Sequence, residues 1–353
     1  MTIPTEPIGS IPRPLKLLEA INRQGSLHTS LEPLYEEAVR KTIEQFEATG
    51  SPVVTDGEQR KYHNFATYCV NGLPNTAPDG FKLLFSAGHT RRWPRLTSGP
   101  FRFQMYGYDF LECALKYAHV PVKQAVISPS ALSLMYPADN LPGYPREEFI
   151  KDLLDEHQKE IRGCLAKGAH KVQVDFTEAR LAVKMDPSGG LLSSFIELNN
   201  IALGRFSETE RRQIGVHTCP GADRDSTHSA EVDYAELLPS LFELQAGNFY
   251  IALAGEPDRI SVLKIIRRYL KPGQQIFIGV VSPIDPRIEN PEQIRDRILE
   301  AARYIPLEQL GTTDDCGFSP FCDDTSTTRA TAFAKIRSRV EGTALAEEMI
   351  NGR

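Results

Sequence analysis

Apolar runs with the spacing of buried strands alternate along this chain with segments that have the periodicity of amphipathic helices. The strand-like runs are short, β-branched and mostly apolar, and they span residues 51–57, 122–128, 171–176, 213–218, 248–254 and 275–281. A weaker run follows at 309–313, and a further candidate lies at 101–107 or at 8–11. Continuous apolar runs of this length are typical of strands buried on both faces of a parallel sheet.

Helical periodicity fills the intervals between these runs. Apolar side chains recur at helical spacing in residues 31–48, and Gly50 then ends the helix. Similar patterns cover 148–167, 234–245, 257–270 and 292–304, and residues 325–350 predict one long helix or a broken pair.

Repeated strand–helix units without a dividing linker favour one α/β domain. We predict a single (β/α)8 TIM barrel that spans residues 1–353. Residues 62–110 are rich in proline, glycine and aromatic side chains and lack clear periodicity. They predict an irregular, lid-like excursion over the mouth of the barrel.

Composition and charge narrow the classes of function. The 353 residues are 41% hydrophobic, and the net charge of −6 comes without a basic stripe, so we expect no nucleic-acid partner. No run reaches the ~18 apolar residues of a membrane helix, and residues 1–14 lack the features of a signal peptide. The six scattered cysteines indicate a reduced, cytoplasmic protein without membrane association.

Metal-ligating residue types stand at predicted strand ends, where barrel enzymes hold their active sites. His217 and Cys219 end the run at 213–218, and Cys316 follows the last strand-like run. Residues two apart on a strand point to the same side, so His217 and Cys219 can reach one metal. Two thiolates and an imidazole suit Zn²⁺, with one position left open for substrate. The alternatives are ordinary buried residues, or Cys322 as a competing ligand.

Carboxylates end other predicted strands. Asp56 and Glu58 close the run at 51–57, and Asp175 ends the run at 171–176. Acids in such positions often cap the following helix. Several carboxylates at one barrel mouth beside a metal would instead form a binding site for an amino group.

Taken in order, these motifs resemble the catalytic barrel of the cobalamin-independent methionine synthase family. The matching segments are Ile8-Gly9-Ser10, Asp56-Gly57-Glu58, V-K-Q-A-V-I-S-P at 122–129, V-Q-V-D at 172–175, H-T-C at 217–219, G-V at 279–280 and D-C-G at 315–317. One such motif is weak evidence, whereas the whole series in the same order is specific.

The resemblance implies a zinc ion held by one histidine, two cysteines and one glutamate. His217, Cys219 and Cys316 match three of these ligands. Glu256 is the acid nearest the end of the run at 248–254, and it would be the fourth ligand unless water or substrate takes that position.

The family also implies a substrate site. Ser10, Glu58 and Asp175 match the residues that bind the amino-acid thiol in the family. The histidine that methionine synthases carry after their seventh strand is missing here, and Asp285 is the candidate acid in its place. The carbon-donor half of the site therefore resembles the short single-barrel relatives, which include epoxyalkane:coenzyme M transferases.

The resulting prediction is a zinc-dependent transferase that holds a small, homocysteine-like thiol as a zinc thiolate for methyl or alkyl transfer from an unidentified carbon donor. The alternative is a zinc-dependent C–S lyase or an epoxide:thiol transferase of the coenzyme M type. A sulfonate-bearing thiol would need basic residues at the barrel mouth, and the candidates are Arg60, Lys61, His63, Arg91 and Arg92. A metal-free relative of the uroporphyrinogen decarboxylase kind is disfavoured by the H-T-C and D-C-G motifs.

Overall fold

A parallel six-stranded sheet forms the centre of the molecule. The computed structural model describes residues 2–62, 64–222 and 225–352. The strand order is β10-β9-β8-β7-β6-β5, so each strand pairs with its neighbour in the sequence. The strands are β5 (Gln124–Ile127), β6 (Val172–Asp175), β7 (Ile214–Thr218), β8 (Asn248–Ile251), β9 (Gln275–Val281) and β10 (Leu310–Asp314). Each of them falls on one of the predicted runs.

Two short segments extend this sheet at its edges. Thr5 forms a parallel bridge with Thr312 of β10, and Val54 forms one with Val122 beside β5. The α/β class with a parallel sheet is confirmed. The closed (β/α)8 barrel that the sequence predicts is not confirmed, since the strand ladders of the described residues hold six strands and the two flanking segments add single bridges.

Two strand candidates are therefore not regular strands. The run at 51–57 makes a single bridge at Val54, and Gly57 and Glu58 at its end turn the chain with φ of +67° and +56°. Residues 101–106 lie outside the strands of the described chain, and a helix begins at Gly107.

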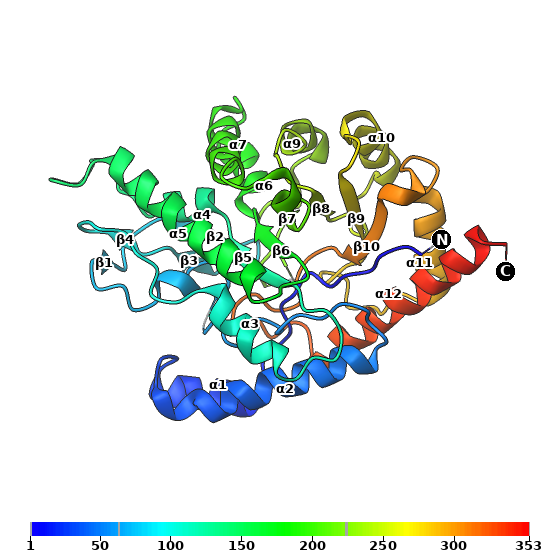
Figure 1. Ribbon diagram of the computed structural model, residues 1–353, viewed down its shortest axis with the longest axis horizontal. Coiled ribbons are helices and arrows are strands. Elements are labelled where there is room, and N and C mark those ends of the chain that lie inside the picture. The colour runs from blue at the N-terminus through cyan, green and yellow to red at the C-terminus, as the bar shows by residue number, and fades with distance from the viewer. Residues whose placement is uncertain (1, 63, 223–224, 353) are drawn as a thin grey trace.

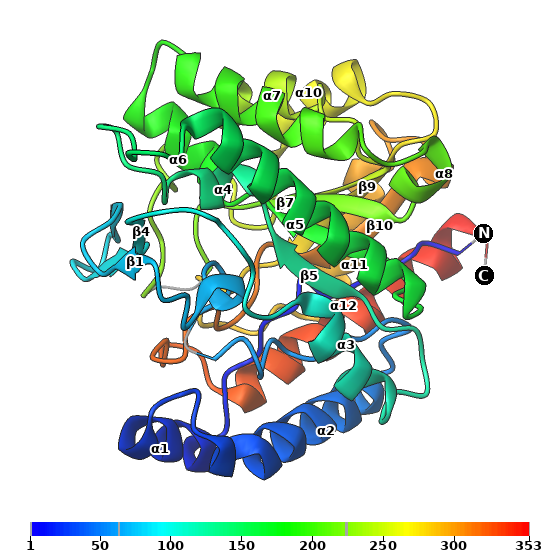
Figure 2. The ribbon, with the colours of Figure 1, turned by 60° about the vertical axis from the view of Figure 1, so that its left-hand side comes forward.

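Helices cover the sheet (Figures 1 and 2). In Figure 1, α7, α9 and α10 lie along the top, and α2 and α12 cross the lower part of the molecule. The helices are α1 (Leu15–Gln24), α2 (Glu32–Ala48), α3 (Gly107–Leu115), α4 (Pro129–Ser133), α5 (Arg146–Ala166), α6 (Glu178–Met185), α7 (Gly190–Leu203), α8 (Glu208–Arg211), α9 (Tyr234–Leu241), α10 (Arg259–Tyr269), α11 (Pro291–Ala301) and α12 (Arg329–Ile350). The predicted helices correspond to α2, α5, α9, α10, α11 and a single continuous α12.

Side-chain caps explain where the last two helices begin. Asn290 accepts a hydrogen bond from Gln293 N (2.8 Å) directly before Pro291, the first residue of α11. Thr328 caps α12 in the same way, accepting from Thr331 N at 3.0 Å. Proline suits the first helical position because it lacks the N–H group that would have no partner there.

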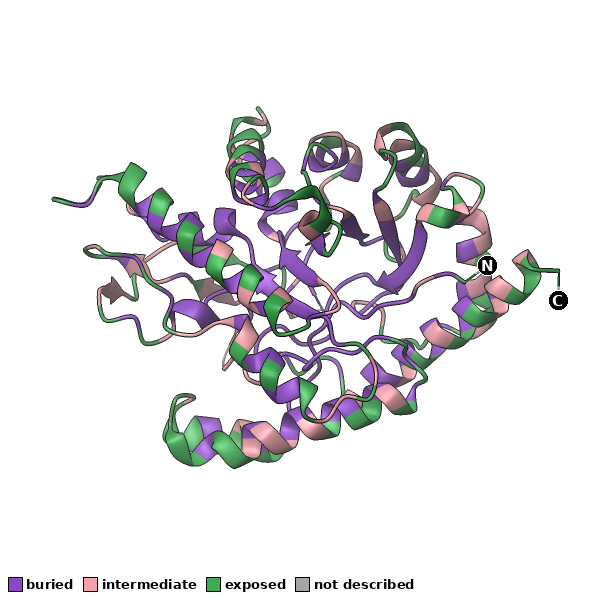
Figure 3. Ribbon diagram, in the orientation of Figure 1, coloured by how far each residue is buried: buried purple, intermediate pink, exposed green. Residues whose placement is uncertain are grey.

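The strands are buried on both faces, whereas the longer helices, such as α2 and α5, bury one face and expose the other (Figure 3). Strand register places Asp175, His217, Tyr250 and Phe277 side by side across β6, β7, β8 and β9. Asp175 is the last residue of β6 and His217 the last but one of β7, so both lie at the carboxyl edge of the sheet. Among the helices of the described residues, none combines the length and apolarity needed to cross a membrane.

The region 62–110 is irregular, as the sequence predicts. It contains two small antiparallel pairs, β1 (Thr76–Ala77) with β4 (Arg95–Leu96) and β2 (Lys82–Leu84) with β3 (Thr90–Arg92). Its buried aromatic side chains belong to a second apolar core that also includes residues of α4 and α5. The pairs lie at the left in Figure 1, beside the carboxyl edge of the sheet.

Candidate metal centre and substrate pocket

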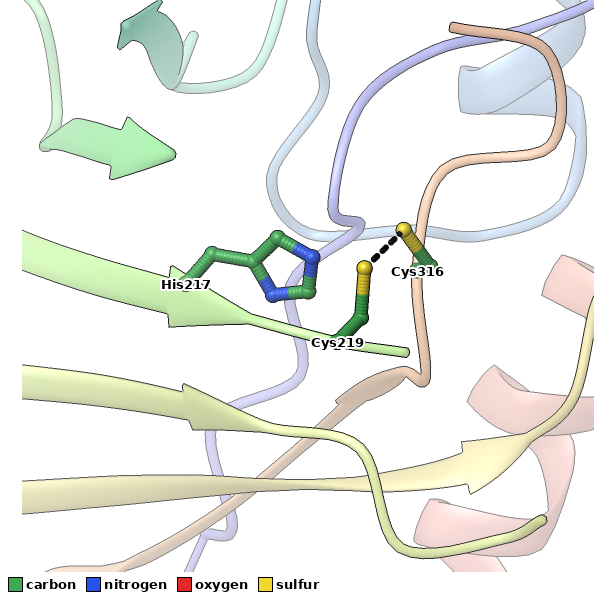
Figure 4. A group of neighbouring side chains, drawn as sticks. All are labelled: His217, Cys219 and Cys316. Atoms are coloured by element: carbon green, nitrogen blue, oxygen red, sulfur yellow. Dashed lines mark hydrogen bonds between the residues drawn. The ribbon is translucent and has the colours of Figure 1, made fainter. Parts of the chain in front are cut away.

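His217, Cys219 and Cys316 meet at the carboxyl edge of the sheet (Figure 4). His217 lies on β7, Cys219 follows the end of that strand, and Cys316 follows β10. Their ligand atoms lie within 4.8 Å of one another, and the two sulfur atoms are 2.8 Å apart. All three residues are buried. The two-residue spacing in the sequence puts His217 and Cys219 on one side, and the fold adds Cys316 from 97 residues away.

The protonation of these three residues is linked. Burial opposes ionisation of Cys219, but the hydrogen bond from Cys316 and the charge on His217 hold the pKa of the Cys219 thiol well below its ordinary value. Burial and the neighbouring Cys219 raise the pKa of Cys316. Burial would lower the pKa of His217, yet the Cys219 thiolate raises it. The group therefore already favours one thiolate beside an imidazole.

The donor set fits a zinc ion. His217 Nδ1 lies 3.3 Å from the carbonyl oxygen of Tyr250, to which it donates when that nitrogen is protonated. Nε2 of the same ring is buried and has no hydrogen-bond partner among the described residues. An imidazole fixed through one nitrogen, with the other turned toward two sulfur ligands, is the arrangement that zinc sites use.

This group of three residues lies in the wall of a partly open pocket. Aromatic and aliphatic side chains make up much of the remaining wall, including Phe65, Leu83, Phe85, Trp93 and Phe321. A mostly apolar pocket with a few convergent polar groups is the usual form of a small-molecule site.

Ser10, Glu58 and Asp175 line the same pocket, so the structure brings the predicted substrate residues together with the predicted metal ligands. Ser10 Oγ accepts a hydrogen bond from Ser319 N at 3.1 Å. Asp175 Oδ1 accepts from the amide of Gln173 at 2.8 Å.

Glu58 reaches the pocket from a left-handed backbone conformation, which is costly for a residue with a Cβ atom. Hydrogen bonds hold it there, from Glu58 N to Asp56 Oδ1 (2.8 Å) and from Arg13 to Glu58 O (2.9 Å). Burial raises the pKa of Glu58 to about 7, with Lys61 opposing the shift and Asp175 adding to it.

Lys61 is a buried cation that the sequence analysis did not place in this group. Its Nζ lies 3.5 Å from Glu58 Oε1 and 4.8 Å from the ring centre of Tyr68. Its charge also acts on Asp56 and Asp175. The buried Arg13 also acts on Asp56 and Glu58, so two buried cations stand among three carboxylates, and one negative charge is left over when all are ionised.

Glu256 is not brought to the three ligands. Its carboxylate pairs with Arg180 of α6 at 2.6 Å, and the three-residue group does not include it. The physical reason lies in the preceding loop, where the Asp315 carboxylate accepts hydrogen bonds from the N–H groups of Leu253, Ala254 and Gly255 at 2.7, 2.8 and 2.7 Å. These bonds hold the chain after β8 in place and direct Glu256 toward Arg180.

Asp285 is also placed away from the pocket. Its carboxylate binds Arg287 at 2.7 Å, it does not line the pocket, and the hydrogen bond from Arg287 lowers the pKa of Asp285 to about 2. An acid with that pKa is ionised at neutral pH, so it has no proton to donate. Asp285 and Arg287 form a local ion pair in the loop after β9, with the Arg287 side chain 86% exposed.

Of the predicted sulfonate-binding residues, Arg60 pairs with Glu32 at 2.5 Å and Arg91 with Asp323 at 2.6 Å. Together with Lys61 and Arg92, they are absent from the described lining of the pocket. His63 lies outside the described residues.

The sequence analysis missed His228, a buried pocket residue from the loop after β7. Its Nδ1 lies 2.8 Å from Ser229 Oγ, and burial lowers the pKa of the ring to about 4, so it is neutral at pH 7. The loop between β7 and α9 has no periodicity that would identify a pocket residue in it. The only available signal was a histidine eleven positions after His217.

The fold and the site together define an α/β enzyme with a candidate metal centre and an acidic substrate pocket at the carboxyl edge of its sheet. The sequence profile of the cobalamin-independent synthase catalytic domain matches residues 3–341. The chain therefore belongs to this family of methionine synthase-like transferases, as its motifs predict.

The sequences of individual relatives align with almost the whole of this chain. The methionine synthase of Sulfurisphaera tokodaii is 22% identical, over 99% of this chain and 94% of that protein. The protein YxjH of Bacillus subtilis is 25% identical, over 95% of this chain and 92% of that protein.

Solved structures show the same fold. The B12-independent methionine synthase of Shewanella sp. W3-18-1, determined in complex with selenomethionine, superposes with a TM-score of 0.76 at 17% identity and covers all of both chains. A putative vitamin-B12-independent methionine synthase from Listeria monocytogenes gives a TM-score of 0.67 at 21% identity, over 98% of each chain.

Proposed function

We propose that this protein is a zinc-dependent transferase that activates a small, homocysteine-like thiol and transfers a methyl or alkyl group to it. The observation that carries the proposal is the position of His217, Cys219 and Cys316 in one pocket wall with Glu58 and Asp175. Residues suited to activating a thiol and carboxylates suited to binding an ammonium group thus line one pocket.

His217, Cys219 and Cys316 would hold the zinc ion. Bound there, zinc lowers the pKa of a substrate thiol, so that the thiolate is available at neutral pH. With three protein ligands, a fourth position remains for the substrate sulfur, as in catalytic zinc sites. Because Glu256 is held by Arg180, it is not proposed as a ligand.

The residues of the chain then orient the amino acid. Glu58 and Asp175 bind its ammonium group, and Glu58 Oε2 has no hydrogen-bond partner among the described residues. The Ser10 hydroxyl, whose oxygen already accepts from Ser319 N, has its hydrogen available for the substrate carboxylate. The selenomethionine bound by the Shewanella relative supports an amino acid with a substituted chalcogen as the ligand class.

The reaction forms a bond between the substrate sulfur and a carbon of the donor. The bond from that carbon to its leaving group breaks, and its electron pair goes to the leaving group, while the thiol proton is released. Apolar side chains around the pocket exclude water, which would otherwise compete as a nucleophile.

The coenzyme M alternative has less support. A sulfonate requires a cation, and the basic candidates with described positions do not line the pocket, whereas two carboxylates do. An amino-acid thiol is the better match to this charge.

The test is the zinc content of the purified protein and of three cysteine variants. We expect about one zinc per chain in the wild type and loss of zinc in Cys219→Ser and Cys316→Ser. Cys322→Ser is the matched control, because Cys322 is the half-buried cysteine outside the group and should leave zinc content unchanged. Zinc retained in both site variants, while circular dichroism shows them folded, would contradict the proposal.

A further inference from the structure

Beyond the exclusion of water, the chemistry described above gives no role to the part of the pocket wall that is formed by Phe65, Leu83, Phe85, Trp93 and Phe321. We call these five residues the aromatic wall. Four come from the excursion at 62–110, and Phe321 comes from the loop after β10. All five are buried, although each lines the pocket.

The aromatic wall is a packed, preformed surface. The ring of Phe321 makes edge-to-face contacts with Phe65 and Phe85, both at 5.6 Å between centres. Backbone hydrogen bonds fix the same segments, from Phe65 N to Pro320 O (3.1 Å) and from Ser86 N to Thr227 O (2.7 Å). The shape of this surface is therefore set before a ligand arrives.

Charge is confined to another part of the pocket. Among the described lining residues, the carboxylates are Glu58 and Asp175, and lysine and arginine are absent. Arg91 stacks on Phe321 at 4.7 Å but pairs with Asp323 and is not a lining residue. His228, whose ring centre lies 6.1 Å from that of Phe85, is neutral at pH 7.

We propose that the aromatic wall binds the transferred group of the carbon donor, and that this group is an uncharged alkyl or aryl substituent. The inference rests on the proposed function and specifies its second substrate. A charged substituent would lose its hydration against this wall and find no described partner of opposite charge there, whereas each apolar carbon gains from burial. The bonding change is the displacement already given, with the apolar carbon as the electrophile.

The test uses thioethers of homocysteine as product analogues that share one amino-acid end and differ only beyond sulfur. We would titrate the zinc-loaded protein with methionine, S-butyl-homocysteine and S-(2-carboxyethyl)-homocysteine. Binding is followed by calorimetry and by the fluorescence of Trp93, the single tryptophan of the chain.

We expect S-butyl-homocysteine to bind about 50-fold more tightly than methionine, since three extra buried methylenes contribute roughly 0.8 kcal/mol each. The carboxyethyl compound should bind at least about tenfold more weakly than methionine. Leu83→Ala should reduce the butyl-to-methyl preference severalfold. Leu84→Ala is the matched control, because the neighbouring Leu84 is 60% exposed and lies outside the pocket lining.

Two other outcomes distinguish a failure of the inference about the donor from a failure of the proposed function. If methionine binds but the butyl compound binds no more tightly, or the carboxyethyl compound binds equally well, the inference about the donor is wrong and the proposed function stands. If none of the three thioethers binds to zinc-loaded protein, the amino-acid substrate itself is wrong, and the inference fails with it.

Discussion

Replacement of Asp315 by alanine should release the loop that follows β8 and weaken the adjacent metal site. The carboxylate accepts three N–H groups from residues 253–255 at 2.7–2.8 Å, in a buried position next to Cys316. Hydrogen bonds to a charged group contribute about 1.5–3 kcal/mol each, and relief of the buried charge offsets part of the loss. We therefore expect a decrease of roughly 3–5 kcal/mol in the free energy of unfolding.

Asp315→Asn provides a graded comparison. Oδ1 accepts from Leu253 and Ala254, and Oδ2 accepts from Gly255. An asparagine can keep the first two bonds but presents an NH₂ group to the third N–H. Burial of the charge raises the pKa of Asp315, so ionisation of this carboxyl destabilises the folded state. Removal of the charge in asparagine therefore offsets the loss of the third bond, and we expect its free energy of unfolding to change by less than about 1 kcal/mol.

Thermal unfolding at about pH 8 measures both variants. Burial raises the pKa of Asp315 to about 7, so the carboxylate is mostly ionised at that pH. An unfolding entropy of about 2.1 cal/mol/K per residue predicts a decrease in Tm of roughly 4–7 °C for the alanine variant and a change of about 1 °C or less for the asparagine variant. Zinc affinity should fall in the same order, because Cys316 follows Asp315 directly in the chain.

The control is Asp296→Ala, which removes an exposed carboxylate paired with Arg295 and should change stability by less than about 0.5 kcal/mol. The reasoning is refuted if Asp315→Ala melts within about 1 °C of this control and binds zinc as tightly as the wild type.

Three further predictions test the surroundings of the site. Glu256→Ala should leave zinc content unchanged and lower the free energy of unfolding by about 3 kcal/mol, because it removes the partner of the buried Arg180. Loss of zinc in this variant would instead identify Glu256 as a ligand. Methionine affinity should rise with pH by up to about tenfold per unit below pH 7 and level off above it, because the ammonium group requires ionised Glu58. In Glu58→Gln this pH dependence should disappear, and calorimetry across the pH range measures the affinity of both proteins. Gly279→Ala should cost about 1–3 kcal/mol in denaturant unfolding, since the added Cβ would overlap the Asp315 carboxylate; unchanged stability would show that the carboxylate has room to move.

Much of the fold follows from local patterns in the sequence. Strands β5 to β10 lie on continuous apolar runs because both faces of this sheet are buried, and such burial leaves a direct record in residue type. His217 and Cys219 were identifiable as a pair because the alternation along a strand fixes their common side. Helices such as α7 were not predicted, although Pro187 and Gly189 precede α7 and Gly204 follows it.

The composition of the site depended on contacts that the local sequence does not encode. Asp315, about sixty residues away, binds the loop after β8 and turns Glu256 toward Arg180. Asp285 pairs locally with Arg287 and does not line the pocket. The sequence by itself determined the elements and the residue types at their ends, since these depend on periodicity along one segment. Only the tertiary structure decided which side chains share a cavity, because loop direction is set by hydrogen bonds and ion pairs between distant segments.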